Sequence, residues 1–81
     1  MRLILLGTAG CHLCEDADAL IKKTLPNIEV ELIDIAEQEY WQAMYAMSIP
    51  VLLDLDSQEE LAWRFIEDDV IRFIKNLGVQ I

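Results

Sequence analysis

The sequence predicts a single α/β domain over residues 1–81, with strands and helices in the order βαβαββα. Short aliphatic runs alternate with segments of helical periodicity, a pattern typical of a sheet covered by helices. The chain has 81 residues, which is too short for two independent cores. Its hydrophobic fraction of 54% beside 26% charged residues favours a packed core over a disordered chain.

The first half of the chain predicts a strand, a helix and a second strand. Residues 2–6 form an aliphatic run that is too short for a stable helix and is apolar on both faces, as a central strand is. A helix is predicted from His12 to Pro26 by apolar residues at helical spacing, namely Leu13, Ala17, Leu20, Ile21 and Leu25. Residues 28–32 alternate apolar and acidic side chains, which predicts a strand with one face in water. We expect these elements to form a right-handed parallel βαβ unit.

The second half predicts a helix, a hairpin and a last helix. Residues 37–47 are predicted to be helical, with an apolar face made of Ala36, Tyr40, Ala43 or Met44, and Met47. Residues 51–53 and 61–63 are apolar and flank a polar segment, so we expect a hairpin that turns near residues 56–58. The last helix is predicted from Val70, Phe73, Ile74 and Leu77, and Gly78 ends it.

Charge and composition exclude several classes of function. The chain has 15 acidic against 6 basic residues and a net charge of -9, which is a poor fit to nucleic acid because phosphate binding needs clustered Lys and Arg. No apolar stretch approaches the ~20 residues that a membrane span needs. The first residues lack the long apolar region and cleavage site of a secretory signal, so we expect a cytoplasmic protein.

The motif that carries chemistry is Cys11-His12-Leu13-Cys14, placed between a predicted strand and the first turn of a helix. The backbone N–H groups and the helix dipole at this position stabilise a thiolate, so Cys11 is the predicted nucleophile. Cys14 lies one turn away and is the predicted resolving thiol. Zinc sites with this cysteine spacing need a second ligand pair, which the chain lacks, so no metal ligand is assigned. The alternative, two buried apolar cysteines, does not explain the glycines at positions 7 and 10.

The strand, the glycine-bracketed loop, the CxxC motif, the helix and the later Ile49-Pro50 pair resemble the glutaredoxin branch of the thioredoxin superfamily over the whole chain. The resemblance implies a thioredoxin-like fold: a four-stranded mixed sheet in the order 2-1-3-4, with helices one and three on one face and helix two on the other. It also implies that Pro50 is a cis-proline beside the dithiol. The backbone amide and carbonyl of Ile49 would then pair with an extended substrate.

The chain departs from glutathione-using members of this family at three places. It has His12-Leu13 where they usually place Pro-Tyr, it has no basic residue just before the cysteines, and it has Phe65 to Asp69 in place of a glycine-rich turn. These departures argue against glutathione, and no organic cofactor is expected. His12 and Leu13 remain candidates to face the substrate, and a protonated His12 would also stabilise a Cys11 thiolate.

Three functions stay open on these residues. The leading one is a thiol-disulfide oxidoreductase that reduces protein disulfides or small mixed disulfides through Cys11 and Cys14. The second is metal or iron-sulfur binding through the same cysteines. The third is a thioredoxin-fold binding module without turnover. The acidic charge predicts a partner with a basic surface, and the chain is expected to be a monomer. Trp41, Tyr45 and Trp63 are expected to be core or partly covered residues, and Trp63 is also a candidate substrate platform.

Overall fold

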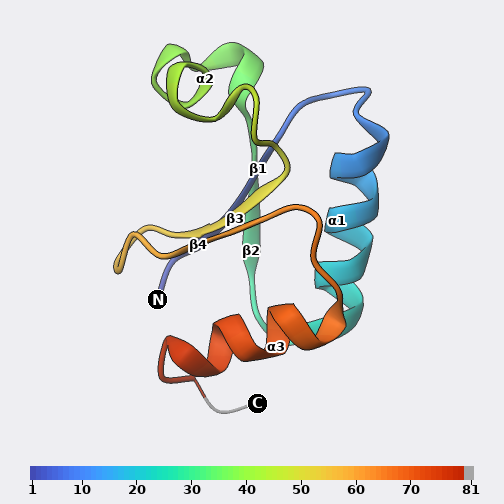
Figure 1. Ribbon diagram of the computed structural model, residues 1–81, viewed down its shortest axis with the longest axis vertical. Helices are drawn as coiled ribbons and strands as arrows, with labels where there is room; N and C mark the ends of the chain where they lie inside the picture. The colour runs from blue at the N-terminus through green and yellow to red at the C-terminus, as the bar shows by residue number, and fades with distance from the viewer. Residues whose placement is uncertain (80–81) are drawn as a thin grey trace.

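The computed structural model describes residues 1–79 (Figure 1). Its elements are β1 (Leu3–Gly7), α1 (His12–Thr24), β2 (Val30–Asp34), the short 3-10 helix η1 (Ile35–Glu37), α2 (Glu39–Tyr45), β3 (Val51–Asp54), β4 (Glu60–Ala62) and α3 (Glu67–Asn76). The predicted order βαβαββα is confirmed, with boundaries that move by a few residues. Among residues 1–79 no helix is long and apolar enough to span a membrane.

The four strands form one mixed sheet in the order β2-β1-β3-β4. β1 and β2 are parallel, while β3 is antiparallel to both β1 and β4. The order 2-1-3-4 is therefore confirmed. β1 and β3 are central strands, and the residues of both are buried throughout, as expected for strands that are covered on both faces.

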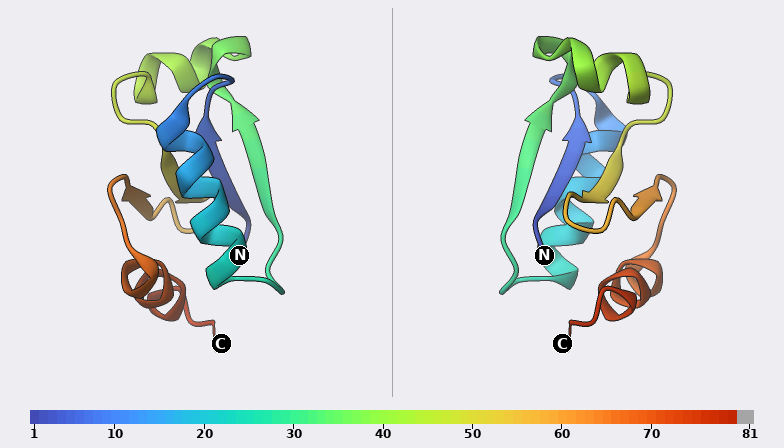
Figure 2. Two further views of the ribbon diagram at one scale, coloured as in Figure 1. Left: turned by 90° about the vertical axis from the view of Figure 1, so that its right-hand side faces the viewer. Right: turned by 90° about the vertical axis from the view of Figure 1, so that its left-hand side faces the viewer.

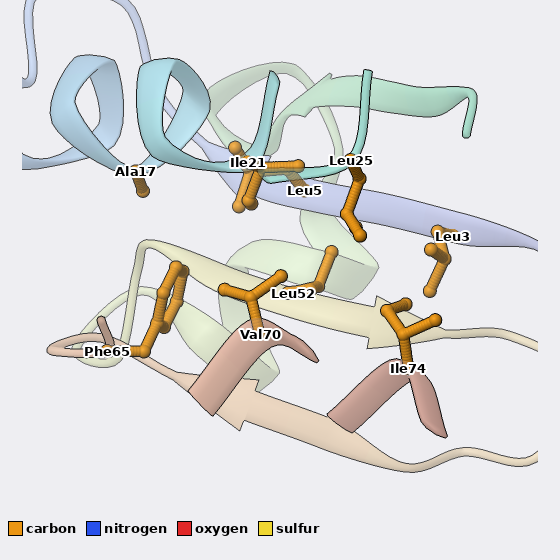
Figure 3. Packing of buried hydrophobic residues seen from close by; sticks show 9 residues of the cluster. All are labelled: Leu3, Leu5, Ala17, Ile21, Leu25, Leu52, Phe65, Val70 and Ile74. Carbon is orange, nitrogen blue, oxygen red and sulfur yellow. The ribbon is translucent and has the colours of Figure 1, made fainter. Parts of the chain in front are cut away.

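The two faces of the sheet carry two separate hydrophobic clusters. On one face Leu3, Leu5 and Leu52 pack against residues of α1 and α3 and against Phe65 (Figure 3). On the other face Ile4, Leu6, Val51 and Leu53 pack with Ile35, and Trp41 and Tyr45 of α2 cover them. Figure 2 shows α1 on one side of the strands and α2 across the end where β1 and β2 finish. The predicted distribution of helices over the two faces is confirmed.

The predicted apolar face of the second helix is wrong. Tyr40 and Met44 are exposed and Met47 is 99% exposed, whereas Trp41 and Tyr45 pack against the sheet. Two sets of apolar residues share helical spacing in this segment. Trp41 and Tyr45 are the set that is buried, because they contact the cluster that contains Leu6. The helix also ends at Tyr45, where the phenolic hydroxyl donates to the Glu60 carboxylate at 2.6 Å and ties α2 to β4.

The second strand also differs from its prediction. It runs from Val30 to Asp34, and Leu32 is 55% exposed although it belonged to the predicted buried face. β2 is an edge strand, and α1 does not cover Leu32. The sheet is thus left open beside α1 at this edge.

Candidate functional site

The candidate site lies at one edge of the sheet, where β1 and β2 end and β3 begins. Gly7 pairs with Asp34 at the carboxyl ends of the parallel strands. Leu6 pairs with Val51, so Pro50 enters the sheet at the same edge. The loop from Thr8 to Gly10 leads from this edge to α1 (Figure 1). Gly10 has φ +77°, a left-handed conformation that favours glycine at this turn.

Cys11 is the N-cap residue of α1. Its sulfur accepts a hydrogen bond from the backbone N–H of Cys14 at 3.2 Å, and its carbonyl accepts from Glu15 N at 3.0 Å. The side chain is half-buried and is a free thiol. The Cys11 sulfur therefore sits at the positive end of the helix dipole, with a main-chain donor directed at it, which is the environment of a reactive cysteine.

Cys14 is the inner member of the pair. It is 8% exposed, and a side chain added at Gly7 would have its Cβ 3.1 Å from Cys14 Cβ and 3.2 Å from Cys14 Sγ. Burial raises the pKa of Cys14 to about 11, with help from a hydrogen bond to Cys11 and from the charges of Cys11 and Asp34. Cys14 is therefore a neutral thiol near pH 7, while Cys11 is the more accessible sulfur.

A pocket of about 270 Å³ opens beside Cys14, between α1 and β2. Its wall is largely apolar, with Leu5, Leu32 and Ala9, and carries the carboxylates of Glu15, Asp18 and Asp34. Neither this pocket nor Asp34 was predicted from the sequence. The available signal was that parallel strands place their carboxyl ends together, which brings Asp34 next to the loop that holds the cysteines.

His12 and Leu13, between the cysteines, face outward. The side chain of His12 is 94% exposed, and its Nδ1 lies 3.7 Å from the Glu15 carboxylate. Leu13 is 48% exposed. The structure thus places an exposed apolar side chain next to the cysteines, and the charged partner of His12 is Glu15.

Ile49 and Pro50 occupy the turn from α2 into β3. The Ile49–Pro50 peptide bond is cis, Pro50 is fully buried, and its carbonyl accepts from Trp63 N at 3.0 Å. The expectation that the Ile49 amide is free for a substrate is wrong, because this N–H donates to the Tyr45 carbonyl at 3.2 Å. The bond closes the carboxyl end of α2, whose last carbonyls need donors.

A second hollow lies on the other side of α1, between this helix and the start of α3. Trp63, Arg64 and Phe65 line it together with Asp16, Glu67 and Asp68. Trp63 is half-buried, meets Phe65 edge to face at 4.9 Å between ring centroids, and has the Arg64 guanidinium 5.7 Å from its ring. Its expected partial burial is confirmed. Asp69 accepts from Ile66 N at 3.0 Å, so a carboxylate of the chain itself occupies the amino end of α3.

The metal-binding alternative concerns Cys11 and Cys14. In the part of the chain that the structure describes, no group of three or more His, Cys, Asp or Glu side chains is arranged to hold a metal ion.

The family pattern of the Glutaredoxin-like domain (DUF836) matches residues 2–75. The chain belongs to this family. The resemblance inferred from the CxxC motif and its surroundings is confirmed, and the glutaredoxin-like chain has the thioredoxin-superfamily fold.

Three solved structures are similar to this glutaredoxin-like chain. Protein Ne2328 from Nitrosomonas europaea is 33% identical with a TM-score of 0.71, and the match covers 88% of this chain and 86% of that one. Protein XcR50 from X. campestris is 23% identical with a TM-score of 0.82, covering 93% and 97%. Thioredoxin 1 from Thermosipho africanus TCF52B is 23% identical with a TM-score of 0.72, covering 96% and 94%. No curated protein matches the chain.

Proposed function

We propose that this chain is a thiol-disulfide oxidoreductase in which Cys11 attacks the substrate disulfide and Cys14 resolves the mixed disulfide. One observation carries the proposal: the Cys11 sulfur caps α1 and accepts the N–H of Cys14, while Cys14 is buried one turn further on. The difference in exposure and in environment supports different roles for the two sulfurs.

The proposed reaction has two steps. The Cys11 thiolate attacks one sulfur of the substrate, forming a Cys11–substrate disulfide and releasing the other substrate sulfur as a thiolate. The Cys14 sulfur then attacks the Cys11 sulfur, which forms the Cys11–Cys14 disulfide and releases the second substrate thiol. The dithiol loses two electrons and the Cys14 proton, and the substrate disulfide becomes one thiolate and one thiol. An external thiol reductant restores the dithiol.

The substrate class we assign is a protein disulfide on a basic surface. The net charge of -9 and the carboxylates of Glu67 and Asp68 beside the second hollow disfavour glutathione, which carries two carboxylates. Leu13 is the exposed apolar contact next to the dithiol, and Pro50 and Ile49 flank the site at the start of β3. We assign substrate contact to Leu13, to His12 and to the half-buried side chain of Ile49, while the buried Pro50 supports this part of the site from within.

The test is to trap the mixed disulfide with a disulfide-bonded basic peptide and to locate it by mass spectrometry. Cys14→Ser should accumulate the peptide on Cys11, because the resolving thiol is missing. Cys11→Ser should accumulate little adduct, because the buried Cys14 is a poor nucleophile. Adduct found mainly on Cys14 would reverse the assignment, and no adduct on either variant would refute the function.

A further inference from the structure

The strand β2 has an outer edge that no other strand covers. In the order β2-β1-β3-β4, residues 30–34 pair with β1 on one side, and no strand of residues 1–79 pairs with the other side. Alternate residues of a strand turn their N–H and C=O groups to opposite sides, so part of the β2 main chain points away from the sheet. Figure 2 shows β2 as an outer strand to one side of α1. The edge is therefore accessible to a further strand.

An apolar side chain is exposed along this edge. Leu32 is 55% exposed and lines, together with Leu5 and Ala9, the pocket of about 270 Å³ between β2 and α1. Edge strands that are protected against pairing usually carry a charged side chain or a proline at such a position. An exposed leucine beside an apolar pocket instead offers a contact to an apolar side chain of an added strand.

The charges along this edge are acidic. Glu31 lies within β2 and Glu29 directly precedes it, and both side chains are exposed. Because side chains alternate along a strand, Glu31 lies on the face of the sheet opposite to Leu32. Within residues 1–79 neither carboxylate forms a salt bridge, although Arg2 lines a hollow beside both of them. β2 itself contains no basic residue.

These charges determine which kind of strand can pair with β2. A second copy of this chain would bring its own Glu29 and Glu31 to the edge, and like charges on neighbouring strands destabilise a sheet. The net charge of -9 on each copy adds repulsion over a longer range. A segment that carries Lys or Arg at the same positions gains pairs of opposite charge instead. The charge of the edge therefore favours a basic partner over a second copy.

We propose that the outer edge of β2 binds an extended segment of a partner protein in which apolar and basic side chains alternate. The segment adds a fifth strand to the sheet through main-chain hydrogen bonds. Its apolar side chains lie on the side of α1 and contact Leu32 and the pocket, while its basic side chains lie on the opposite face near Glu29 and Glu31. Binding needs no covalent step, so the inference goes beyond the proposed function and does not depend on the dithiol.

The test is the binding of a capped, cysteine-free peptide of about seven residues in which valine and lysine alternate, since such a peptide covers the five residues of β2. Amide NMR shifts should be largest at residues 30–34, and binding should weaken as salt is added. The same peptide with N-methylated interior amides keeps every charge but loses its main-chain donors, so it should bind about tenfold more weakly or worse. No binding, equal binding of the two peptides, or shifts centred on the start of β3 or of α3 would overturn the proposal. Since the peptide has no cysteine, failure of the oxidoreductase function would leave this result unchanged.

Two matched variants separate the edge from the net charge. Leu32 and Met44 are both 55% exposed, so Leu32→Lys and Met44→Lys should both keep the fold, which circular dichroism checks. Leu32→Lys introduces a charge of the kind that protects natural edge strands and should weaken peptide binding by about tenfold, whereas Met44→Lys, on α2, should change it by less than about twofold. Glu31→Gln should weaken binding by about two- to fivefold, and more than Glu37→Gln does. Equal losses within either pair would overturn the proposal. A native dimer that Leu32→Lys converts to a monomer in sedimentation would assign the edge to a second copy and overturn it as well.

Discussion

The backbone N–H of Cys14 donates to the Cys11 sulfur over 3.2 Å, so the two cysteines are linked by a hydrogen bond within the first turn of α1. This bond gives one of the unpaired N–H groups at the start of α1 an acceptor, and it keeps the Cys11 sulfur next to Cys14. Cys14 in turn fills the space above Gly7. The position of the dithiol therefore depends on the end of β1, on the start of α1 and on the glycine at position 7.

Replacing Gly7 with Ala should destabilise the fold through Cys14. The new methyl group would lie 3.1 Å from Cys14 Cβ and 3.2 Å from Cys14 Sγ, closer than normal packing allows. We expect a loss of about 1–3 kcal/mol in the free energy of unfolding, measured by urea denaturation. Gly10→Ala is the control, because nothing lies within 4 Å of its Cβ position and only its φ of +77° adds a cost. Native stability of Gly7→Ala in the reduced protein would contradict the close contact.

The buried Asp54 should contribute stability that is lost in acid. Burial acts to raise its pKa, but hydrogen bonds from Arg2 N, from Ser57 and from Asp56 N outweigh burial and lower the pKa below its ordinary value. Because the folded value is the lower one, the contribution is present above the ordinary pKa of about 3.8 and disappears as the pH falls through the folded value.

Asp54→Asn should remove this dependence. The amide has one acceptor oxygen in place of two, so we expect a loss of about 1–3 kcal/mol near neutral pH and a flatter acid limb in urea denaturation. Asp56→Asn, at the exposed carboxylate that pairs with the N-terminus at 2.9 Å, is the comparison and should cost less. Parallel acid limbs for the native chain and Asp54→Asn would contradict the role of Asp54.

Cys14 should make the reduced protein less stable in alkali. Its folded pKa of about 11 exceeds the ordinary 9.0, so folding favours the protonated thiol. The contribution is complete below about pH 9 and falls by up to about 1.4 kcal/mol per pH unit as the pH rises toward 11. Cys14→Ser has no titrating group here, and its unfolding free energy should fall less between these pH values. Identical curves would show that burial does not disfavour the thiolate.

The carboxylates at the start of α3 should limit the use of glutathione. Glu67 and Asp68 line the second hollow and are exposed, so salt and water screen them. We expect the double change Glu67→Gln, Asp68→Asn to raise kcat/KM for a glutathionylated peptide by about two- to fivefold at low salt. The pair Glu29→Gln, Glu31→Gln removes the same charge elsewhere and should have a smaller effect. An equal effect of both pairs would mean that the net charge of the protein, and not the carboxylates of this hollow, limits the use of glutathione.

The elements of the fold could be predicted because each carries its own periodicity. The apolar spacing from Leu13 to Leu25 predicts α1, whose buried residues include Ala17 and Ile21. The buried face of α2 was not predictable from spacing alone, since Tyr40 with Met44 and Trp41 with Tyr45 satisfy the same helical period. Only the position of the sheet decides between them.

The cysteines of the candidate site could be predicted, but their surroundings could not. Cys11 and Cys14 are three residues apart in the chain, and a helix start places them together whatever the rest of the fold does. Asp34 joins them only through the register of β2 on β1, which sequence spacing does not encode. Likewise, the Ile49 N–H bonds to the Tyr45 carbonyl because α2 ends at Tyr45, and sequence spacing did not predict this end.

The most direct test of the dithiol is the mass of the intact protein after equilibration in a thiol-disulfide redox buffer. We predict that the monomer loses two hydrogens reversibly, with a Cys11–Cys14 bond located by peptide mapping, and that one midpoint potential describes the change. Disulfide-linked dimers, or a monomer that keeps both thiols or carries a buffer adduct on Cys14 at oxidising potentials, would contradict it.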